Sequence, residues 1–408
     1  MTQLRAVSLP LRDVLDLVPD LNDIARGDGH LFVRDRVGVA GRGVAARLPF
    51  DDAARALRGI DHETELSHAS PIAIGSVPFH PGAPAEVIVP EVLVRKHREH
   101  DPWITAVVPA DAPRPTAAEL ADALAIPDPA PPTATGFRLS PAAPVTHYLA
   151  AVRAARDAVA AGELTKAVIA RPIEIVADEP VDLHAVLRRL RASFGSSYRY
   201  SIEGLVGASP ELLVEVDGPA VRSHPLAGTA PRTGDVDNDT RIAAELIAST
   251  KNQVEHRVVI DVVHDTLLPW SSYLDWEPEP SVVKVANVQH LGTRMEGRLS
   301  QPGPAVTELV RALTPTPALG GHPRDLAIEL IERVEGFERG RYGGAVGWVD
   351  GNGDGTWAVA IRCAEFSADR CHARLVAGGG IVAASDPHAE LAETQAKFQA
   401  MLSAIVRP

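Results

Sequence analysis

Three side chains near the C-terminus have the types and spacing of a charged site on one helix. Glu390, Glu393 and Lys397 lie three and four residues apart, which puts them on one helical face. The run Ala377–Ile381 (AGGGI) precedes them, and glycines before a helix expose backbone N–H groups that can hold an anion. A solvated charged stripe is the ordinary interpretation of the spacing, but the two features together favour a binding site.

Another carboxylate, Glu255, lies in Lys251–Arg257 (KNQVEHR), inside a long helical pattern. Mg²⁺ prefers oxygen ligands, often one or two carboxylates completed by water and substrate. Glu255 and Glu393 could supply such ligands from two helices. Charge spacing alone does not bring two distant helices together.

The elements that must carry these residues follow from hydrophobic periodicity, caps and turn residues. The patterns predict helices over 146–161 (capped by Thr146 and stopped by Gly162), 183–194, 239–267 (broken near Ser249–Thr250), 325–334 and 388–404 (capped by Asp386). They predict strands over 166–176, 212–216 and 220–223 (a hairpin across Asp217–Gly218), 281–288, 345–349 and 357–361.

The first third of the chain differs from the rest in its sequence pattern, which is mostly strand-like. Its strand-like runs are Leu31–Arg34, Val37–Val39, Ile72–Ile74 and Val87–Val94, and Ile126–Gly136 (IPDPAPPTATG) has the composition of a linker. We therefore expect a β-rich N-terminal part over 1–136, which completes the core structurally, and a catalytic region over 137–408. Strands and helices that do not alternate strictly indicate an α+β fold.

Composition excludes several classes of protein. The 408 residues include 45% hydrophobic and 23% charged residues, with a net charge of −13. This excess of acid argues against a nucleic-acid-binding protein, and two cysteines are too few for a disulfide framework. Charges interrupt Met1–Asp20, and no apolar run is long enough to span a membrane. We expect a cytoplasmic protein that binds neither nucleic acid nor membrane.

The second half resembles the chorismate-utilising enzymes, which include isochorismate synthases, salicylate synthases and the large subunits of anthranilate and aminodeoxychorismate synthases. The resemblance covers about residues 144–403 and rests on nine short segments in the family's order. They are KAVIAR (166–171), GASPEL (207–212), PLAGT (225–229), KNQVEH (251–256), VQHLG (288–292), TPTPALGGHP (314–323), YGGAVG (342–347), AIR (360–362) and ELAETQAK (390–397).

This resemblance implies a fold and a ligand set. The fold is α+β, with large mixed or antiparallel sheets that form a two-subdomain sandwich covered by helices. Mg²⁺ would hold the ring carboxylate of chorismate through Glu255 and Glu393, with Glu390 as a supporting carboxylate. The implied substrate-binding residues are Ala227, Gly228, Thr229, His290, Tyr342, Ile361, Arg362, Gly378, Gly379 and Lys397.

The catalytic pair implied by the resemblance is Lys166 and Glu211. Water attacks C2 of the ring while the C4 hydroxyl leaves, which needs a base and an acid on opposite faces. Lys166 occupies the position of the base in the water-using members, and Glu211 that of the acid. We expect both to be buried, because burial favours the neutral amine and the protonated carboxyl.

Within the family, the sequence is most similar to isochorismate synthases, whose product feeds siderophore or menaquinone synthesis. Ala227 stands where aminodeoxychorismate synthases have a reactive lysine, and no glutamine-hydrolysing nucleophile turn is visible, so we expect no glutaminase partner. Many members of the family act as monomers, and no coiled-coil pattern or exposed apolar stripe is visible, so we also expect a monomer. Two alternatives stay open. A salicylate synthase would also eliminate pyruvate, a difference to which His290 could contribute, and a degenerate relative would bind chorismate without turnover.

Overall fold

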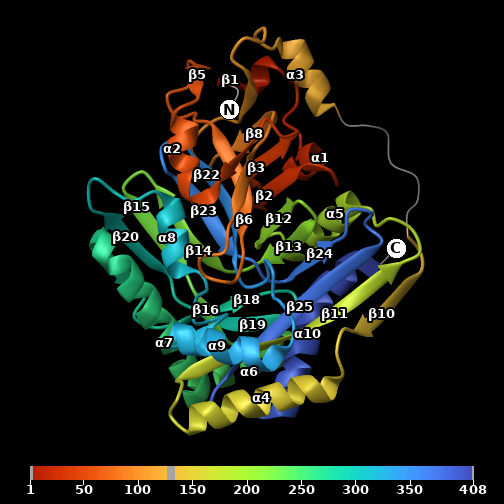
Figure 1. The fold of residues 1–408 in the computed structure, drawn as a ribbon, viewed down its shortest axis with the longest axis vertical. Helices are drawn as coiled ribbons and strands as arrows, with labels where there is room; N and C mark the ends of the chain where they lie inside the picture. The colour runs from red at the N-terminus through yellow and green to blue at the C-terminus, as the bar shows by residue number, and fades with distance from the viewer. Residues whose placement is uncertain (1–2, 126–133, 407–408) are drawn as a thin grey trace.

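The computed structural model describes residues 3–125 and 134–406 and has an α+β architecture (Figure 1). Two large sheets, almost entirely antiparallel, face each other, and most of the helices lie outside them. The α+β sandwich predicted from the sequence is therefore confirmed. None of the helices described here is long and apolar enough to cross a membrane.

The larger sheet contains 13 strands and combines both parts of the chain. Its C-terminal half carries β11 and β25, which pair along ten residues of each strand, from Ala167–Ile381 to Val176–His372. Across the sheet the order is β10 (Phe137–Pro141), β11 (Lys166–Ala177), β25 (His372–Ile381), β24 (Cys363–Phe366), β13 (Leu205–Ser209), β12 (Tyr198–Ile202), β2 (His30–Arg34), β3 (Val37–Arg42), β8 (Val92–Lys96), β9 (Trp103–Pro109), β1 (Leu4–Pro10) and β5 (Asp61–Thr64), with β21 (Gly321–His322) paired to the start of β11.

The second sheet has nine strands and again joins the two parts of the chain, through the pairing of β22 with β6. A third, three-stranded sheet lies beside the large ones. The nine strands are β17 (Ser271–Trp276), β20 (Met295–Leu299), β15 (Ala220–His224), β14 (Leu212–Asp217), β23 (Gly355–Val359), β22 (Ala345–Asp350), β6 (Ile72–Val77), β7 (Glu86–Val89) and β4 (Ala46–Pro49), and the three are β16 (Leu226–Pro231), β19 (Val288–Gly292) and β18 (Ser281–Lys284).

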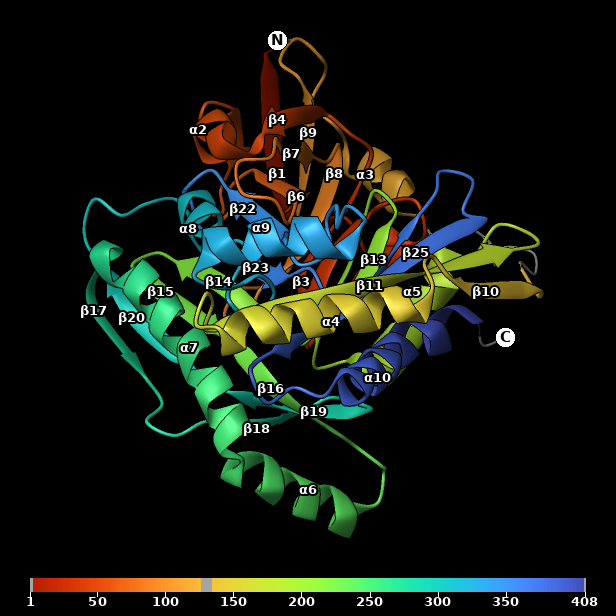
Figure 2. The same cartoon turned by 60° about the horizontal axis from the view of Figure 1, so that its bottom comes forward.

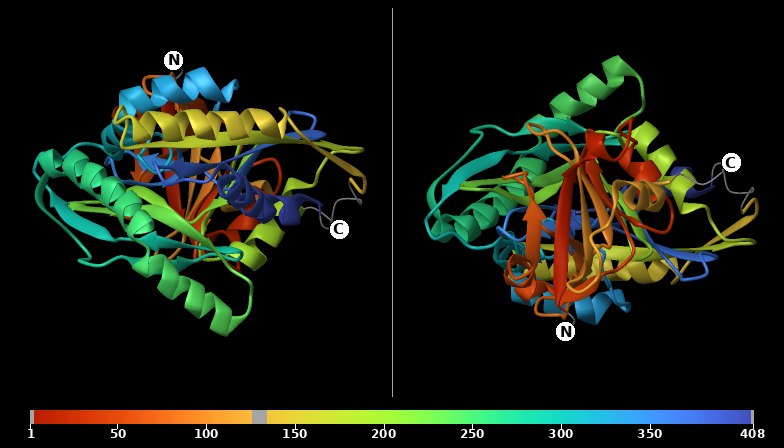
Figure 3. Two further views of the ribbon diagram at one scale, coloured as in Figure 1. Left: turned by 90° about the horizontal axis from the view of Figure 1, so that it is seen from below. Right: turned by 90° about the horizontal axis from the view of Figure 1, so that it is seen from above.

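The helices cover the outer faces of this sandwich. Figure 2 shows α4 and α9 side by side over β11, and both helices contact that strand. In Figure 3, α6 projects from the body of the molecule. The helices are α1 (Leu21–Ala25), α2 (Ala53–Arg58), α3 (Ala117–Leu124), α4 (Val145–Ala160), α5 (Leu183–Phe194), α6 (Val236–Ala248), α7 (Thr250–Leu267), α8 (Val306–Leu313), α9 (Arg324–Glu335) and α10 (Pro387–Val406), with 3₁₀ turns at Leu11–Asp13, Phe50–Asp52 and Leu268–Trp270.

The main core lies between the two large sheets. Phe32 and Tyr200 from the 13-stranded sheet and Val214 and Trp357 from the nine-stranded sheet belong to one buried apolar cluster. Burial of this much apolar surface is the dominant favourable term in folding. It fixes the relative position of strands that lie more than three hundred residues apart in the chain.

Several predicted elements match the structure closely. The helix over 183–194 and the hairpin across Asp217–Gly218 occur as predicted. The long helical pattern breaks at Ser249, whose side chain accepts the Asn252 N–H and begins α7. Asp386 caps α10 by accepting the N–H groups of two residues in its first turn.

Other predicted boundaries were wrong. The run 87–94 is two strands in different sheets, because Pro90 interrupts the ladder. The run 281–288 is likewise the hairpin β18–β19, closed where the Val285 N–H donates to Val288 O. Thr146 lies inside α4, which begins after Pro144 without a side-chain cap. The expected linker 126–136 lies mostly outside the described residues.

Candidate active site

One cavity of about 190 Å³ brings together every residue that the sequence singled out. It is lined by parts of β11, β16, β25, α7, α10 and the loops before β14 and after β23. The predicted residues on its wall are Lys166, Glu211, Ala227, Gly228, Thr229, Glu255, His290, Tyr342, Ile361, Arg362, Gly378, Gly379, Glu390, Glu393 and Lys397.

Lys166 is the first residue of β11 and is almost completely buried. Its Nζ lies 2.9 Å from Oε1 of Glu255, which is on α7. Apolar neighbours on the strand, Ala167 and Val168, are buried as well. A lysine held out of water in this way is available to react only with groups inside the cavity.

Glu211 follows Pro210 in the turn between β13 and β14 and is also buried. Burial raises the pKa of its carboxyl to about 8, against the opposing effects of the Leu226 N–H and of the Lys166 charge. The Leu226 N–H is 3.4 Å from Glu211 Oε1. Glu211 is therefore protonated at neutral pH and can donate a proton.

The acidic face of α10 points into the same cavity, and lysines pair with its carboxylates. Lys397 Nζ is 2.6 Å from Glu393 Oε1 and donates to Gly378 O at 2.7 Å. Lys251 Nζ on α7 is 3.3 Å from Glu390 Oε1. Burial, followed by repulsion from Glu393, raises the pKa of Glu390. Glu255, Glu390 and Glu393 are thus gathered on the cavity wall, each beside a lysine.

The three consecutive glycines lie within β25, so the expectation of a glycine loop before the helix was wrong. Their role is one of close approach. A Cβ on Gly379 would lie 2.6 Å from Glu390 Oε2, and one on Gly380 would lie 2.2 Å from Glu255 Oε1. Only glycine leaves room for these carboxylates beside the strand.

No group of three or more His, Cys, Asp or Glu side chains within 3–125 and 134–406 is arranged to hold a metal ion directly. The donor set is nevertheless suitable for a hard cation. Glu255, Glu390 and Glu393 offer only carboxylate oxygens, and Glu393 and Glu255 both raise the pKa of Glu390 by repulsion. A bound divalent cation would relieve this repulsion.

Arg362, which also lines the cavity, adopts a left-handed backbone conformation (φ 53°) in the loop after β23. Its Nη2 donates to His290 Nε2 at 3.0 Å, whereas its buried Nη1 has no hydrogen-bond partner among the described residues. Burial and the Arg362 charge hold the pKa of His290 well below its usual value. The neutral imidazole therefore accepts from Arg362 and donates from Nδ1 towards Thr229 Oγ1 or Gly228 O.

An unpaired guanidinium nitrogen in a cavity is a site for an anion, since burying a charge without a partner is costly. Tyr342 lines the same cavity near Arg362, and burial raises the pKa of its hydroxyl, so that it remains a neutral donor. The two residues can bind a carboxylate.

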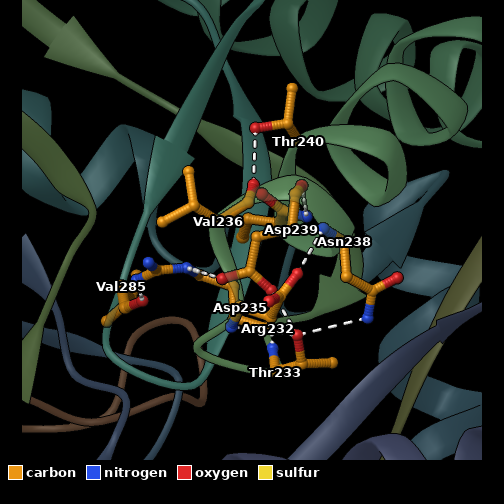
Figure 4. Close-up of polar contacts among 9 residues, drawn as sticks. Arg232, Thr233, Asp235, Val236, Asn238, Asp239, Thr240 and Val285 are labelled. Atoms are coloured by element: carbon orange, nitrogen blue, oxygen red, sulfur yellow. Dashed lines mark hydrogen bonds and ion pairs between the residues drawn. The ribbon is translucent and has the colours of Figure 1, made fainter.

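The strand β16, which carries Ala227, Gly228 and Thr229, is anchored at its far end by a polar cluster (Figure 4). Asp239 on α6 accepts hydrogen bonds from the Thr233 N–H (2.6 Å) and from Arg232 Nε (3.3 Å). Arg232 also donates to Val285 O. The cluster thus ties together α6, the end of β16 and the β18–β19 turn.

Sequence reasoning missed some residues of the cavity wall. Lys251 and Asn252 lie in the KNQVEH segment but were not singled out, and Gly380 was passed over. The spacing of Lys251 and Glu255, four residues apart on one helix, was the signal available for Lys251. The remaining wall residues are apolar or small residues whose types gave no signal of chemistry, although all except Val376 lie in the quoted segments: Val168, Pro210, Leu226, Ala318, Leu319, Val376 and Ala377.

Comparison with known proteins places this geometry in context. Residues 54–406 match the family model described as chorismate binding enzyme. The chain is 41% identical over 352 residues to a protein named putative isochorismate synthase MenF from Mycobacterium tuberculosis, covering 83% of this chain and 87% of that protein. It is 41% identical over 280 residues to isochorismate synthase DhbC from Bacillus subtilis, covering 66% and 70%.

Solved structures agree. A Bacillus anthracis protein, described as a putative 2,3-dihydroxybenzoate-specific isochorismate synthase, superimposes with a TM-score of 0.78 at 31% identity, covering 94% of this chain and 98% of that one. Component I of anthranilate synthase from Streptococcus pneumoniae has a TM-score of 0.72 at 23% identity, which shows the shared fold.

Proposed function

Because this chain belongs to the family of chorismate binding enzymes, we propose that it is an isochorismate synthase, an isomerase that converts chorismate to isochorismate. Relatives named isochorismate synthases match it over most of its length. The observation that carries the proposal is that one cavity contains both a buried lysine, Lys166, and a buried carboxyl, that of Glu211, whose pKa is about 8.

Two sets of wall residues suit the two carboxylates of chorismate. Arg362, with its unpaired Nη1, and Tyr342 bind the enolpyruvyl carboxylate. Glu255 and Glu393, supported by Glu390, would hold Mg²⁺. When bound, the ion neutralises the ring carboxylate. Lys397 and the strand at Gly378 and Gly379 complete this wall.

The protein's own groups then move two protons. Lys166 accepts a proton from the water that attacks C2 of the ring. Glu211, which is protonated at neutral pH, donates to the C4 hydroxyl as it leaves. Ala227, Gly228, Thr229, His290 and Ile361 line the cavity between these groups and shape the space around the ring.

The surroundings of this activity are proposed on the same basis. Relatives of this chain include synthases named for menaquinone-specific and for 2,3-dihydroxybenzoate-specific reactions, so the product would feed menaquinone or siderophore synthesis. We propose a cytoplasmic monomer that needs no glutaminase partner, because water rather than ammonia is the nucleophile.

The direct test is product analysis. Incubation of the purified protein with chorismate and Mg²⁺, followed by chromatography with mass detection, is expected to give a mixture of chorismate and isochorismate without pyruvate. Removal of divalent cations with a chelator should stop the reaction. Salicylate with an equal amount of pyruvate would identify a salicylate synthase, and unchanged chorismate would contradict the proposed activity.

The roles of the base and the acid are tested by Lys166→Ala and Glu211→Ala. Both variants are expected to lose turnover by a factor of about 10² to 10⁴, the usual contribution of a positioned acid or base. Circular dichroism should show an unchanged fold. A rate near that of the unmodified protein in either variant would refute that residue's assignment.

A further inference from the structure

The strand that carries Lys166 has a gap along its outer edge. On that side β11 pairs with β21 only at Lys166 and Ala167, and with β10 only from Ile173 to Ala177. Within the described chain, no strand pairs with the stretch from 168 to 172 on this side, although Gly320 O accepts the Val168 N–H and the Ala142 N–H donates to Pro172 O. The Val168 carbonyl and the Ala170 N–H are left without a partner among the described strands. Backbone N–H and C=O groups at such an edge need other partners when they are buried.

A buried ion pair occupies this gap. Glu335, at the end of α9, accepts the Ala170 N–H at 2.6 Å, and Arg339 Nη2 donates to Val168 O at 2.7 Å. Arg339 Nε in turn donates to Glu335 Oε2 at 2.9 Å. The two side chains are 2% and 0% exposed. Together they replace the missing strand with side-chain hydrogen bonds.

The same guanidinium also contacts the loop at Leu319, which lines the cavity. Arg339 Nη1 donates to Leu319 O at 2.7 Å, and the guanidinium lies 4.3 Å from the centre of the Phe79 ring. Val168 and Leu319 both line the cavity. Arg339 therefore links the strand of the base to the neighbouring loop at Leu319, whose next residue, Gly320, accepts the Val168 N–H. Figure 2 shows α9, which ends at Glu335, running along β11.

We propose that Arg339 and Glu335 are positioning residues, which fix Lys166 relative to the loop at Leu319 without touching the substrate. Lys166 and Val168 lie on the same face of β11, because side chains alternate along a strand. A shift at Val168 therefore moves Lys166 in the cavity. The reaction that this placement serves rests on the proposed function.

The charged pair of Arg339 and Glu335 provides directed hydrogen bonds rather than extra stability. A buried ion pair contributes little net stability compared with apolar residues of similar volume. A planar guanidinium, however, directs its N–H groups along fixed lines to Glu335, Val168 and Leu319. Lysine cannot reproduce these three directions.

The test compares Arg339→Lys and Glu335→Gln with the control Arg311→Lys. Arg311 on α8 binds Asp51 and Ala83 O and does not line the cavity. We expect Arg339→Lys to lower kcat at least tenfold, since a displacement of about 1 Å can cost 10²-fold, and to change KM less than threefold. Hydrogen–deuterium exchange at Val168–Ala170 should rise in both variants, and the control should change neither kcat nor this exchange.

Two results would overturn the proposal. One is faster exchange at Val168–Ala170 with an unchanged kcat, and the other is a fall in kcat no larger than the loss of folded protein measured by thermal unfolding. If the unmodified protein shows no turnover, the proposed function fails by itself. The positioning role is then decided by the exchange and by chorismate affinity in calorimetry, and unchanged values in Arg339→Lys would refute it.

Discussion

Glu211 shows how a single residue can serve chemistry at the expense of stability. Its carboxyl has a pKa of about 8 in the folded protein, against a usual value of 4.5. Between these pH values the folded state holds a proton that the unfolded state has released. The free energy of unfolding therefore falls as the pH rises from 4.5 to 8.

We expect Glu211→Gln to lose activity and gain stability. Glutamine keeps an oxygen that can accept the Leu226 N–H, but it has no acidic proton to transfer and no charge to bury. At pH 8 the variant should melt roughly 1–3 °C higher than the unmodified protein, and the difference should shrink towards pH 4.5. Differential scanning calorimetry across this range checks the sign, and an equal or lower melting temperature at pH 8 would refute it.

The same pKa sets the pH above which the unmodified enzyme should lose activity. Glu211 must be protonated to act as the acid, so its contribution to kcat is full below about pH 8 and is lost as the pH rises through that value. Rates measured under saturating chorismate from pH 6 to 10 should fall on the alkaline side. A rate that stays constant to pH 10 would contradict the assignment of Glu211 as acid.

Gly380 tests the need for close approach at one position. Gly380→Ala would place a methyl group 2.2 Å from Glu255 Oε1 and 2.7 Å from Lys166 Cε, so both side chains must move. We expect turnover to fall about 100-fold, with little change in melting temperature. Gly59→Ala is the matched control, because a Cβ there meets nothing closer than 3.4 Å. An active Gly380→Ala would show that the carboxylate can lie elsewhere.

At the scale of elements, the position of the three-stranded sheet depends on the Asp239 cluster. Asp239 joins α6 to Thr233 and Arg232, and its backbone carbonyl accepts from Gln289 Nε2 beside His290. β16 carries Thr229, which contacts His290 on β19, and His290 in turn contacts Arg362. A loosened cluster should therefore weaken substrate binding more than the chemical step.

Asp239→Ala is therefore expected to raise KM roughly tenfold, equivalent to about 1.4 kcal/mol of binding, while kcat changes less. The exposed neighbour Asp237 offers the control Asp237→Ala, which removes a charge from the first turn of α6 without touching the cluster. Steady-state kinetics on both variants decide the matter. Equal KM values in the two variants would show that the Asp239 cluster does not affect substrate binding.

At the scale of the whole molecule, both large sheets need the N-terminal part. β12 pairs with β2, and β22 pairs with β6, so a chain that begins at Ala134 would expose two strand edges and lack 17 of the 50 buried residues of the main core. We expect this fragment not to fold alone, and co-expression with 1–125 to restore soluble protein. Cooperative unfolding of the isolated fragment, monitored by tryptophan fluorescence, would instead show an independent catalytic domain.

The sequence determined the features that depend on neighbours along the chain. Helix periodicity, the caps at Ser249 and Asp386 and the turn at Asp217–Gly218 are local, and the order of the nine segments identified the family. These signals also named the predicted residues of the cavity wall, because the family's motifs preserve residue types at fixed spacings. Whether each residue has its predicted role remains for the experiments above.

Only the tertiary structure decided which distant groups meet. The contacts between Lys166 and Glu255, and between Lys251 and Glu390, join residues far apart in the chain, and no local periodicity encodes them. Strand pairing likewise placed the three glycines in β25, and burial raised the pKa of Glu211. Burial and strand pairing are properties of the folded chain. These residues therefore acquire their reactivity only in the folded protein, where they are buried and in contact with one another.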